Sequence, residues 1–128
     1  MSILVTKGIK VEAHPTYQAD LSNPLHHKYV FTYQITIRNN SNYAVQLLHR
    51  KWFIFDSAGI KKEVEGEGVV GQQPYLEPGQ EFSYESWCPL ISEMGYMKGH
   101  FVMHRAVDEQ EIEVGIPQFD LIAHYVMN

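Results

Sequence analysis

The sequence predicts an all-β fold, a two-sheet antiparallel sandwich of the immunoglobulin or fibronectin type III kind. Apolar and polar residues alternate with period two in several short runs, and turn signals separate these runs about every ten residues. No segment carries the 3.6-residue apolar stripe of an amphipathic helix. The 128 residues match the usual size of one domain, so we expect residues 1–128 to form a single one.

The clearest strand is predicted over residues 28–39. Apolar residues at alternate positions share one face of it, and polar residues occupy the other, which indicates a half-buried strand. The apolar set is Tyr29, Phe31, Tyr33, Ile35 and Ile37. The Asn-rich residues 39–42 then form a turn, because Asn tolerates positive φ. A second strand is predicted over 45–55, and the two form the centre of the fold.

Shorter strands follow along the chain. Residues 56–59 supply a hairpin turn into the charged run 60–65, which suits an exposed sheet edge. Further strands are predicted over 80–88 and 99–107. A last strand is marked by Ile112, Val114 and Ile116, and we expect Pro117 to end it.

Composition excludes several classes of function. Ten Lys and Arg against fifteen Asp and Glu give a net charge of -5, so we expect no nucleic acid partner. Cys88 is the single cysteine and cannot form an internal disulfide, which favours a cytoplasmic protein. No signal peptide or membrane-spanning run is visible in the sequence, so we expect no membrane association.

The glycine-rich segment 66–74 is the most distinctive motif. Gly66, Gly68 and Gly71 match the dinucleotide pattern G-x-G-x-x-G, but Pro74 and Pro78 forbid the helix that this pattern requires. Two interpretations remain open. Either the loop presents its backbone and two valines to a partner, or it is a tight crossover whose valines enter the core. The exposure of Val69 and Val70 separates them.

No metal, cofactor or catalytic site is predicted. Glu63, Glu65 and Glu67 share a strand face, but parallel side chains do not converge on an ion, and a solvated acidic edge is the better interpretation. His100 and His104 would lie about 13 Å apart on a strand, too far to chelate one ion. No nucleophile motif is present, and we expect Cys88 to be a buried apolar residue. We therefore predict a protein that is not an enzyme.

Arg50 and Trp52 share one face of the strand 45–55, whereas His49 and Lys51 occupy the other. We expect Trp52 to lie in the core, as a Trp on the third strand of a sandwich commonly does. Arg50 would then be a partly buried cation that needs an acid or carbonyl groups.

Together these motifs resemble the ApaG family. The similarity runs through residues 48–52 (LHRKW), 66–74 (GEGVVGQQP), 76–79 (LEPG), 86–90 (SWCPL) and 116–119 (IPQF), in the family's order and spacing. The resemblance implies a fibronectin type III-like sandwich. It also implies competing expectations of function: an association with cobalt and magnesium efflux, or a protein-binding module. Lys51 stands where the family often has His.

The leading hypothesis from the sequence is a non-catalytic module that binds another protein through the glycine loop and an adjoining sheet edge. The second is an anion, pyrophosphate or nucleotide site, in which loop amides and the charge of Arg50 hold a phosphate-containing small molecule. Cobalt or magnesium handling is the third. The candidate residues for binding are Arg50, Gly66, Gly68, Val69, Val70, Gly71 and Gln73.

Overall fold

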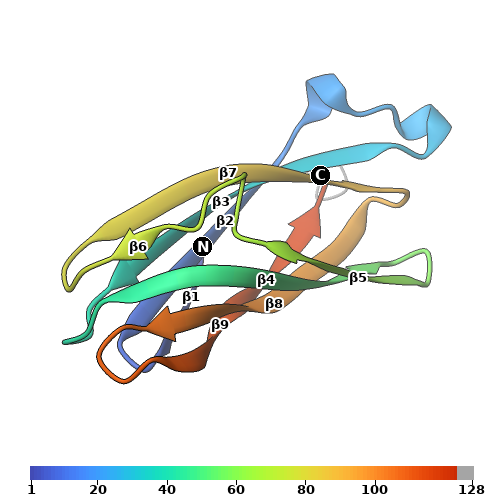
Figure 1. The fold of residues 1–128 in the computed structure, drawn as a ribbon. Coiled ribbons are helices and arrows are strands. Elements are labelled where there is room, and N and C mark those ends of the chain that lie inside the picture. Colours follow the sequence, from blue (N-terminus) through green and yellow to red (C-terminus); the bar gives the residue numbers. More distant parts are fainter. Residues whose placement is uncertain (124–128) are drawn as a thin grey trace.

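A computed structural model describes residues 1–123 as two stacked antiparallel sheets, which confirms the predicted β-sandwich (Figure 1). The first sheet has the order β1 (Ser2–Thr6), β2 (Ile9–Tyr17), β3 (Tyr29–Asn39) and β7 (Glu81–Leu90). The second has the order β5 (Ile60–Glu67), β4 (Val45–Asp56), β8 (Met94–Arg105) and β9 (Gln110–Ile122). The short β6 (Tyr75–Leu76) pairs with the start of β4.

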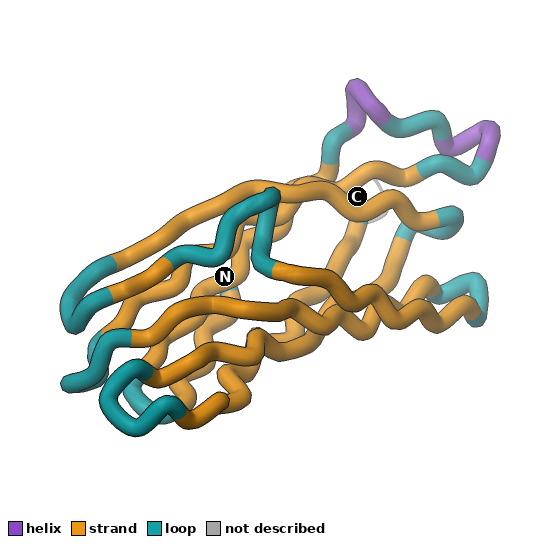
Figure 2. Tube along the Cα trace, viewed as in Figure 1, coloured by secondary structure: helices purple, strands orange, loops and turns teal. Residues whose placement is uncertain are grey.

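Strands make up most of the described chain, and the remaining segments are short (Figure 2). Two 3-10 turns, η1 (Ala19–Leu21) and η2 (Pro24–His26), connect β2 to β3. Within residues 1–123 no helix is long and apolar enough to cross a membrane.

One hydrophobic core lies between the sheets. The apolar face predicted for β3 is buried throughout, as is Trp52 on β4. In the core, Trp52 meets the rings of Tyr33 and Phe119 edge-on, at centroid distances of 5.2 and 5.9 Å. Such edge-to-face contacts are favourable for aromatic pairs. The predicted place of Trp52 in the core is confirmed.

The prediction that Pro117 ends the last strand is wrong. β9 continues to Ile122, and the register with β8 shifts so that Pro117 and its neighbour Gln118 both oppose Lys98. This is a β-bulge, where one residue of a pair is left out of the ladder and a proline is tolerated because no amide proton is needed. The strand therefore continues past the proline to Ile122.

The sandwich is closed along one side and open along the other. At the closed side β1 packs along β9, where the N–H of Gly115 donates to Thr6 Oγ1 at 3.1 Å. At the opposite side the edge strands are β5 and β7, which belong to different sheets and are not paired with each other. Along this open side, no strand pairing within the described chain joins the two sheets.

Pro89 shows that the outer edge of β7 is unpaired. Pro89 lies opposite Val30 of β3. Both main-chain groups of Val30 bond on the side away from β7: its N–H donates to Ser22 Oγ, and its C=O accepts from the N–H of Gln18. Hydrogen-bonded pairs alternate along an antiparallel ladder, so Glu81, Ser83, Glu85 and Trp87 direct their main-chain groups to the free edge with Pro89. A proline is accommodated there without cost to the sheet.

Candidate functional site

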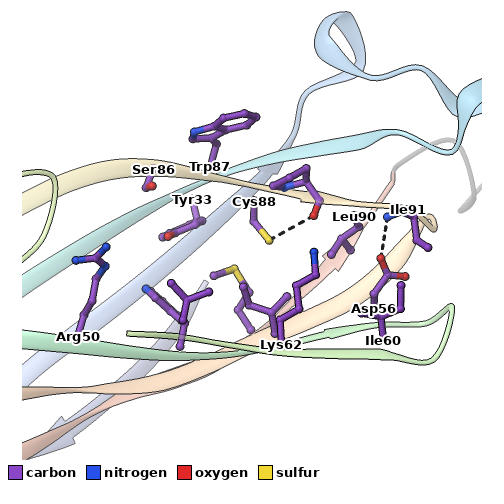
Figure 3. Close-up of a pocket in the computed structure, with 15 residues that line it drawn as sticks. Tyr33, Arg50, Asp56, Ile60, Lys62, Ser86, Trp87, Cys88, Leu90 and Ile91 are labelled. Atoms are coloured by element: carbon purple, nitrogen blue, oxygen red, sulfur yellow. Dashed lines mark hydrogen bonds between the residues drawn. The ribbon is translucent and has the colours of Figure 1, made fainter. Parts of the chain in front are cut away.

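A cleft of about 300 Å³ lies at the open side of the sandwich, between β5 and β7 (Figure 3). Its floor is apolar and formed by core residues. Its two lips are the inward-facing residues of the edge strands, so it is an opening in the core that no strand covers. The floor is made by Tyr33, Trp52, Ile54 and Met97, one lip by Ile60, Lys62 and Val64, and the other by Ser86, Cys88 and Leu90.

Two cations face this apolar cleft. Arg50 projects from β4 at one end and Lys62 from β5 near the middle (Figure 3). Arg50 is half-buried, and its Nη1 donates to the carbonyl oxygens of Glu67 and Gly68, both at 3.0 Å. This matches the predicted Arg50, a partly buried cation satisfied by carbonyl groups. Neither cation takes part in any ion pair among residues 1–123.

The far end of the cleft is closed by a buried carboxylate. Asp56 accepts from the N–H of Ile91 at 2.7 Å, the N–H of Ala58 at 3.0 Å and Ser92 Oγ at 2.5 Å. Burial acts to raise the pKa of Asp56, but these hydrogen bonds outweigh it and hold the pKa below its ordinary value. The carboxylate is thus committed to tying β4 to the turn after β7.

Cys88 lies on the β7 lip and is buried, which confirms the sequence-based prediction. Its Sγ lies 3.9 Å from the carbonyl oxygen of Pro89. Burial raises the pKa of the Cys88 thiol to about 11, and the positive charge of Lys62 only partly offsets this. At neutral pH the thiol is protonated and lines the cleft as an apolar group.

A buried hydroxyl lies near the Arg50 end without a partner. The Oη atom of Tyr84 is inaccessible to solvent and makes no hydrogen bond in the structure. Burial raises the pKa of Tyr84, and Tyr33 and Arg50 are close enough to affect it electrostatically. An unsatisfied buried donor is uncommon and costs stability, and Tyr84 lies below the surface rather than among the residues that line the cleft.

The glycine loop divides its two valines between core and solvent. Val69 is 0% exposed and Val70 is 53% exposed. Val69 and Gln72 exchange both main-chain hydrogen bonds, at 2.8 and 2.9 Å, and the residues between them have positive φ, 43° at Val70 and 79° at Gly71. This is the pattern of a type I′ turn. Val69 therefore enters the core, as the crossover interpretation expects, whereas Val70 is exposed and its contact with a partner stays a prediction.

The other predicted loop residues serve the loop's own structure. The N–H of Gly68 donates to the carbonyl of Leu48 at 2.8 Å, and the side-chain amide of Gln73 donates to the same oxygen at 3.0 Å. At Gly68 a Cβ would collide with the carbonyl oxygen of Gln72. Gly66 lies beneath the guanidinium of Arg50. The structure thus brings Arg50, Gly66, Gly68 and Gln73 together at the junction of β5 with the loop.

The anion hypothesis requires loop amides that are free to bind a ligand. The amides of Gly68, Val69 and Gln72 already donate within the protein, as does Nη1 of Arg50. Internal hydrogen bonds therefore take up much of the donor set that this hypothesis relied on.

Sequence reasoning did not find the cleft itself. Lys62, Tyr33 and Cys88 come from three strands that are distant in sequence, and only the pairing order of the sheets places them together. The alternation in β5 and 80–88 was visible, but which edges remain open is set by the whole topology.

Acidic and histidine side chains do not gather into an ion site among residues 1–123. Glu65 is paired with Lys51 at 2.9 Å, and His100 Nδ1 lies 3.0 Å from Glu113. These contacts join neighbouring strands on the outer face of the second sheet.

Comparison with known proteins places this fold in a family. Residues 19–105 match the model of the ApaG domain. Protein ApaG of Mesorhizobium japonicum is 47% identical over 117 residues, covering 91% of this chain and 89% of that protein, and Protein ApaG of Brucella anthropi is 48% identical over the same shares. A crystal structure of a Bordetella pertussis protein described as ApaA superposes with a TM-score of 0.86 at 38% identity, covering 89% of this chain and 92% of that one. The chain therefore belongs to the ApaG family.

Proposed function

We propose that this protein is a binding module rather than a catalyst, and that it holds an extended segment of another protein along the free edge of β5. The segment would lie across the mouth of the cleft and beside the glycine loop. The observation that carries this proposal is the open side of the sandwich, where an unpaired edge borders an uncovered apolar cleft.

The main chain of β5 supports such pairing. The ladder bond from the N–H of Gly68 to Leu48 marks the even positions of this strand as those that bond to β4. Because paired and unpaired positions alternate, Lys61, Glu63 and Glu65 direct their N–H and C=O groups outward, whereas the C=O of Glu67 already accepts from Arg50 Nη1. An added strand would satisfy these groups, which is how extended peptides bind many sheet edges.

The cleft supports side-chain recognition. Alternate side chains of a strand added to β5 would point between the sheets, since successive residues of a strand face opposite sides. A cleft of about 300 Å³ lies at the lower end of the range for ligand sites. It has room for a few side chains and not for a folded domain, so the partner would insert residues of one extended segment.

The glycine loop has a supporting part in this proposal. Arg50 and Gly68 hold the loop to the end of β5, so the edge keeps a fixed shape next to the cleft. Val70 is the apolar residue that the turn leaves in solvent. A partner lying along β5 would meet Val70 as it passes the loop. This retains the sequence-based hypothesis of loop plus edge, with the buried Val69 removed from the contact surface.

The test uses prolines on the two free edges. Glu63→Pro removes an outward N–H of β5, and Glu85→Pro removes an outward N–H of β7 with the same loss of charge. Both should fold, as measured by circular dichroism and thermal unfolding, because prolines are tolerated at unpaired edge positions. In affinity capture from the native cell followed by mass spectrometry, we expect Glu63→Pro to lose the proteins that wild type and Glu85→Pro retain. Equal capture by folded Glu63→Pro would rule out pairing at β5.

A further inference from the structure

Resting on the proposed function, we infer that the bound segment carries an acid, an apolar residue and a second acid at alternate positions. The observation behind this is an imbalance of charge in the cleft. Arg50 and Lys62 face it, and Asp56 is the one acidic residue that lines it within the described residues 1–123. Its oxygens are already occupied by Ile91, Ala58 and Ser92.

The contrast with Lys51 makes the imbalance clear. Lys51 lies next to Arg50 on β4 but on the outer face, and it pairs with Glu65 at 2.9 Å. Lys61 and Lys62 also occupy opposite faces of β5, with Lys62 facing the cleft, but neither takes part in an ion pair among residues 1–123. The protein thus supplies an acid to Lys51 on its outer face and none to the two cations of the cleft. A carboxylate entering from a partner would meet both positions unopposed.

Arg50 is the stronger of the two positions. It is half-buried, and within the described part of the chain its hydrogen bonds run from Nη1 alone, to the carbonyl oxygens of Glu67 and Gly68. A guanidinium presents five donors, and a carboxylate can accept two of them at once.

The spacing of the cleft sets the spacing of the segment. Arg50 pairs with Gly66, Trp52 with Val64, and Ile54 with Lys62, so these three levels follow one another at every second residue. A strand added to β5 repeats every two residues over about 6.6 to 6.8 Å. Its inward side chains would then meet the cation of Arg50, the apolar floor over Trp52 and the cation of Lys62 in turn. The sequence is acid-x-apolar-x-acid in either direction of the added strand.

The whole-chain charge of -5 makes this recognition local. At long range the protein repels an acidic segment, so unspecific attraction does not favour binding. The carboxylates of the segment gain favourable electrostatic contacts only at Arg50 and Lys62, which face the cleft beside its apolar floor. This separates the inference from a general affinity for acidic peptides.

The experiment titrates capped seven-residue peptides into the protein and follows binding by NMR. The probe is TETLTET, with TQTLTQT removing both acids and TETSTET removing the apolar residue. We expect each control peptide to bind wild type about tenfold more weakly than TETLTET. We expect Lys62→Gln to weaken TETLTET about fivefold, and Lys61→Gln, its neighbour on the outer face, to leave binding unchanged.

The outcomes distinguish the inference from the function it rests on. Equal binding of TETLTET and TQTLTQT, equal effects of Lys61→Gln and Lys62→Gln, or no binding of TETLTET at millimolar concentration would each overturn the charge pattern. Binding of TETLTET that Glu63→Pro does not weaken would instead overturn edge pairing while keeping the pattern. Sedimentation of wild type and Glu63→Pro tests whether a second copy of the chain occupies the β5 edge. A dimer that forms in wild type and is lost in Glu63→Pro would contradict a foreign segment.

Discussion

The guanidinium of Arg50 lies directly over Gly66, so that a Cβ at Gly66 would stand 2.7 Å from Nη1 and 2.8 Å from Nη2. The same Nη1 donates to the carbonyls of Glu67 and Gly68. Gly66 is thus the residue whose missing side chain lets a cation of β4 hold the start of the glycine loop. This explains one glycine of the motif by close packing and not by backbone conformation.

Gly66→Ala should destabilise the protein by about 1 to 2 kcal/mol, because the added methyl displaces Arg50 from its two carbonyl acceptors. The effect should shrink to near zero in the background of Arg50→Ala, where nothing is left to displace. Urea unfolding of the two single variants and the double variant measures this coupling. Additive losses would show that the clash lies with other atoms.

The two valines of the loop should respond oppositely to substitution. Val69→Ser should cost about 2 to 4 kcal/mol, since it empties a core position and buries a hydroxyl. Val70→Asn should instead stabilise by about 0.5 to 1 kcal/mol, because Val70 holds a φ of 43° that a β-branched residue adopts poorly, and Asn-Gly suits a type I′ turn. Thermal unfolding of both variants checks the signs. A loss of stability in Val70→Asn would contradict the turn assignment.

Asp56 should make stability depend on pH in the acid range. Its folded pKa is lowered by hydrogen bonds, so its contribution is complete above the unfolded pKa of about 3.9 and is lost as pH falls through the lower folded pKa. At pH 7, Asp56→Asn should cost about 2 to 4 kcal/mol. The difference in free energy of unfolding between wild type and Asp56→Asn should narrow below about pH 4. Urea titrations at several pH values, with Asp20→Asn on exposed η1 as control, measure it.

More of the fold than of the candidate site could be predicted from the sequence. Alternation along β3 and β4 reports directly which side chains face the core, so the burial of Tyr33 and Trp52 follows from local pattern. Pro117 misled the assignment of β9, because a bulge opposite Lys98 depends on a partner strand that local sequence does not reveal.

The cleft depends on relationships between strands. Whether Lys62 faces an open cleft or a neighbouring strand is decided by β5 and β7 being the last strands of their sheets on the same side. The glycine motif was visible in the sequence itself, and the structure shows Arg50 hydrogen-bonded to it at Gly68. The vacant side of the sandwich has no sequence pattern of its own.

Cys88 gives a prediction that reports on the cleft directly. Burial raises its pKa to about 11, above the ordinary value near 8.5, so the folded protein keeps the neutral thiol at pH 8 to 9 while the unfolded chain ionises. Because the folded pKa is the higher one, this contribution to stability is complete below about pH 8.5 and is lost as pH rises toward about 11. Wild type should therefore lose stability over this range relative to Cys88→Ala.

Iodoacetamide should alkylate native Cys88 far more slowly at pH 8 than it alkylates the urea-unfolded chain. The peptide TETLTET should slow the alkylation further by covering the β7 lip. Native alkylation as fast as that of the unfolded chain would show that the thiol is not held in the buried position from which the cleft is built.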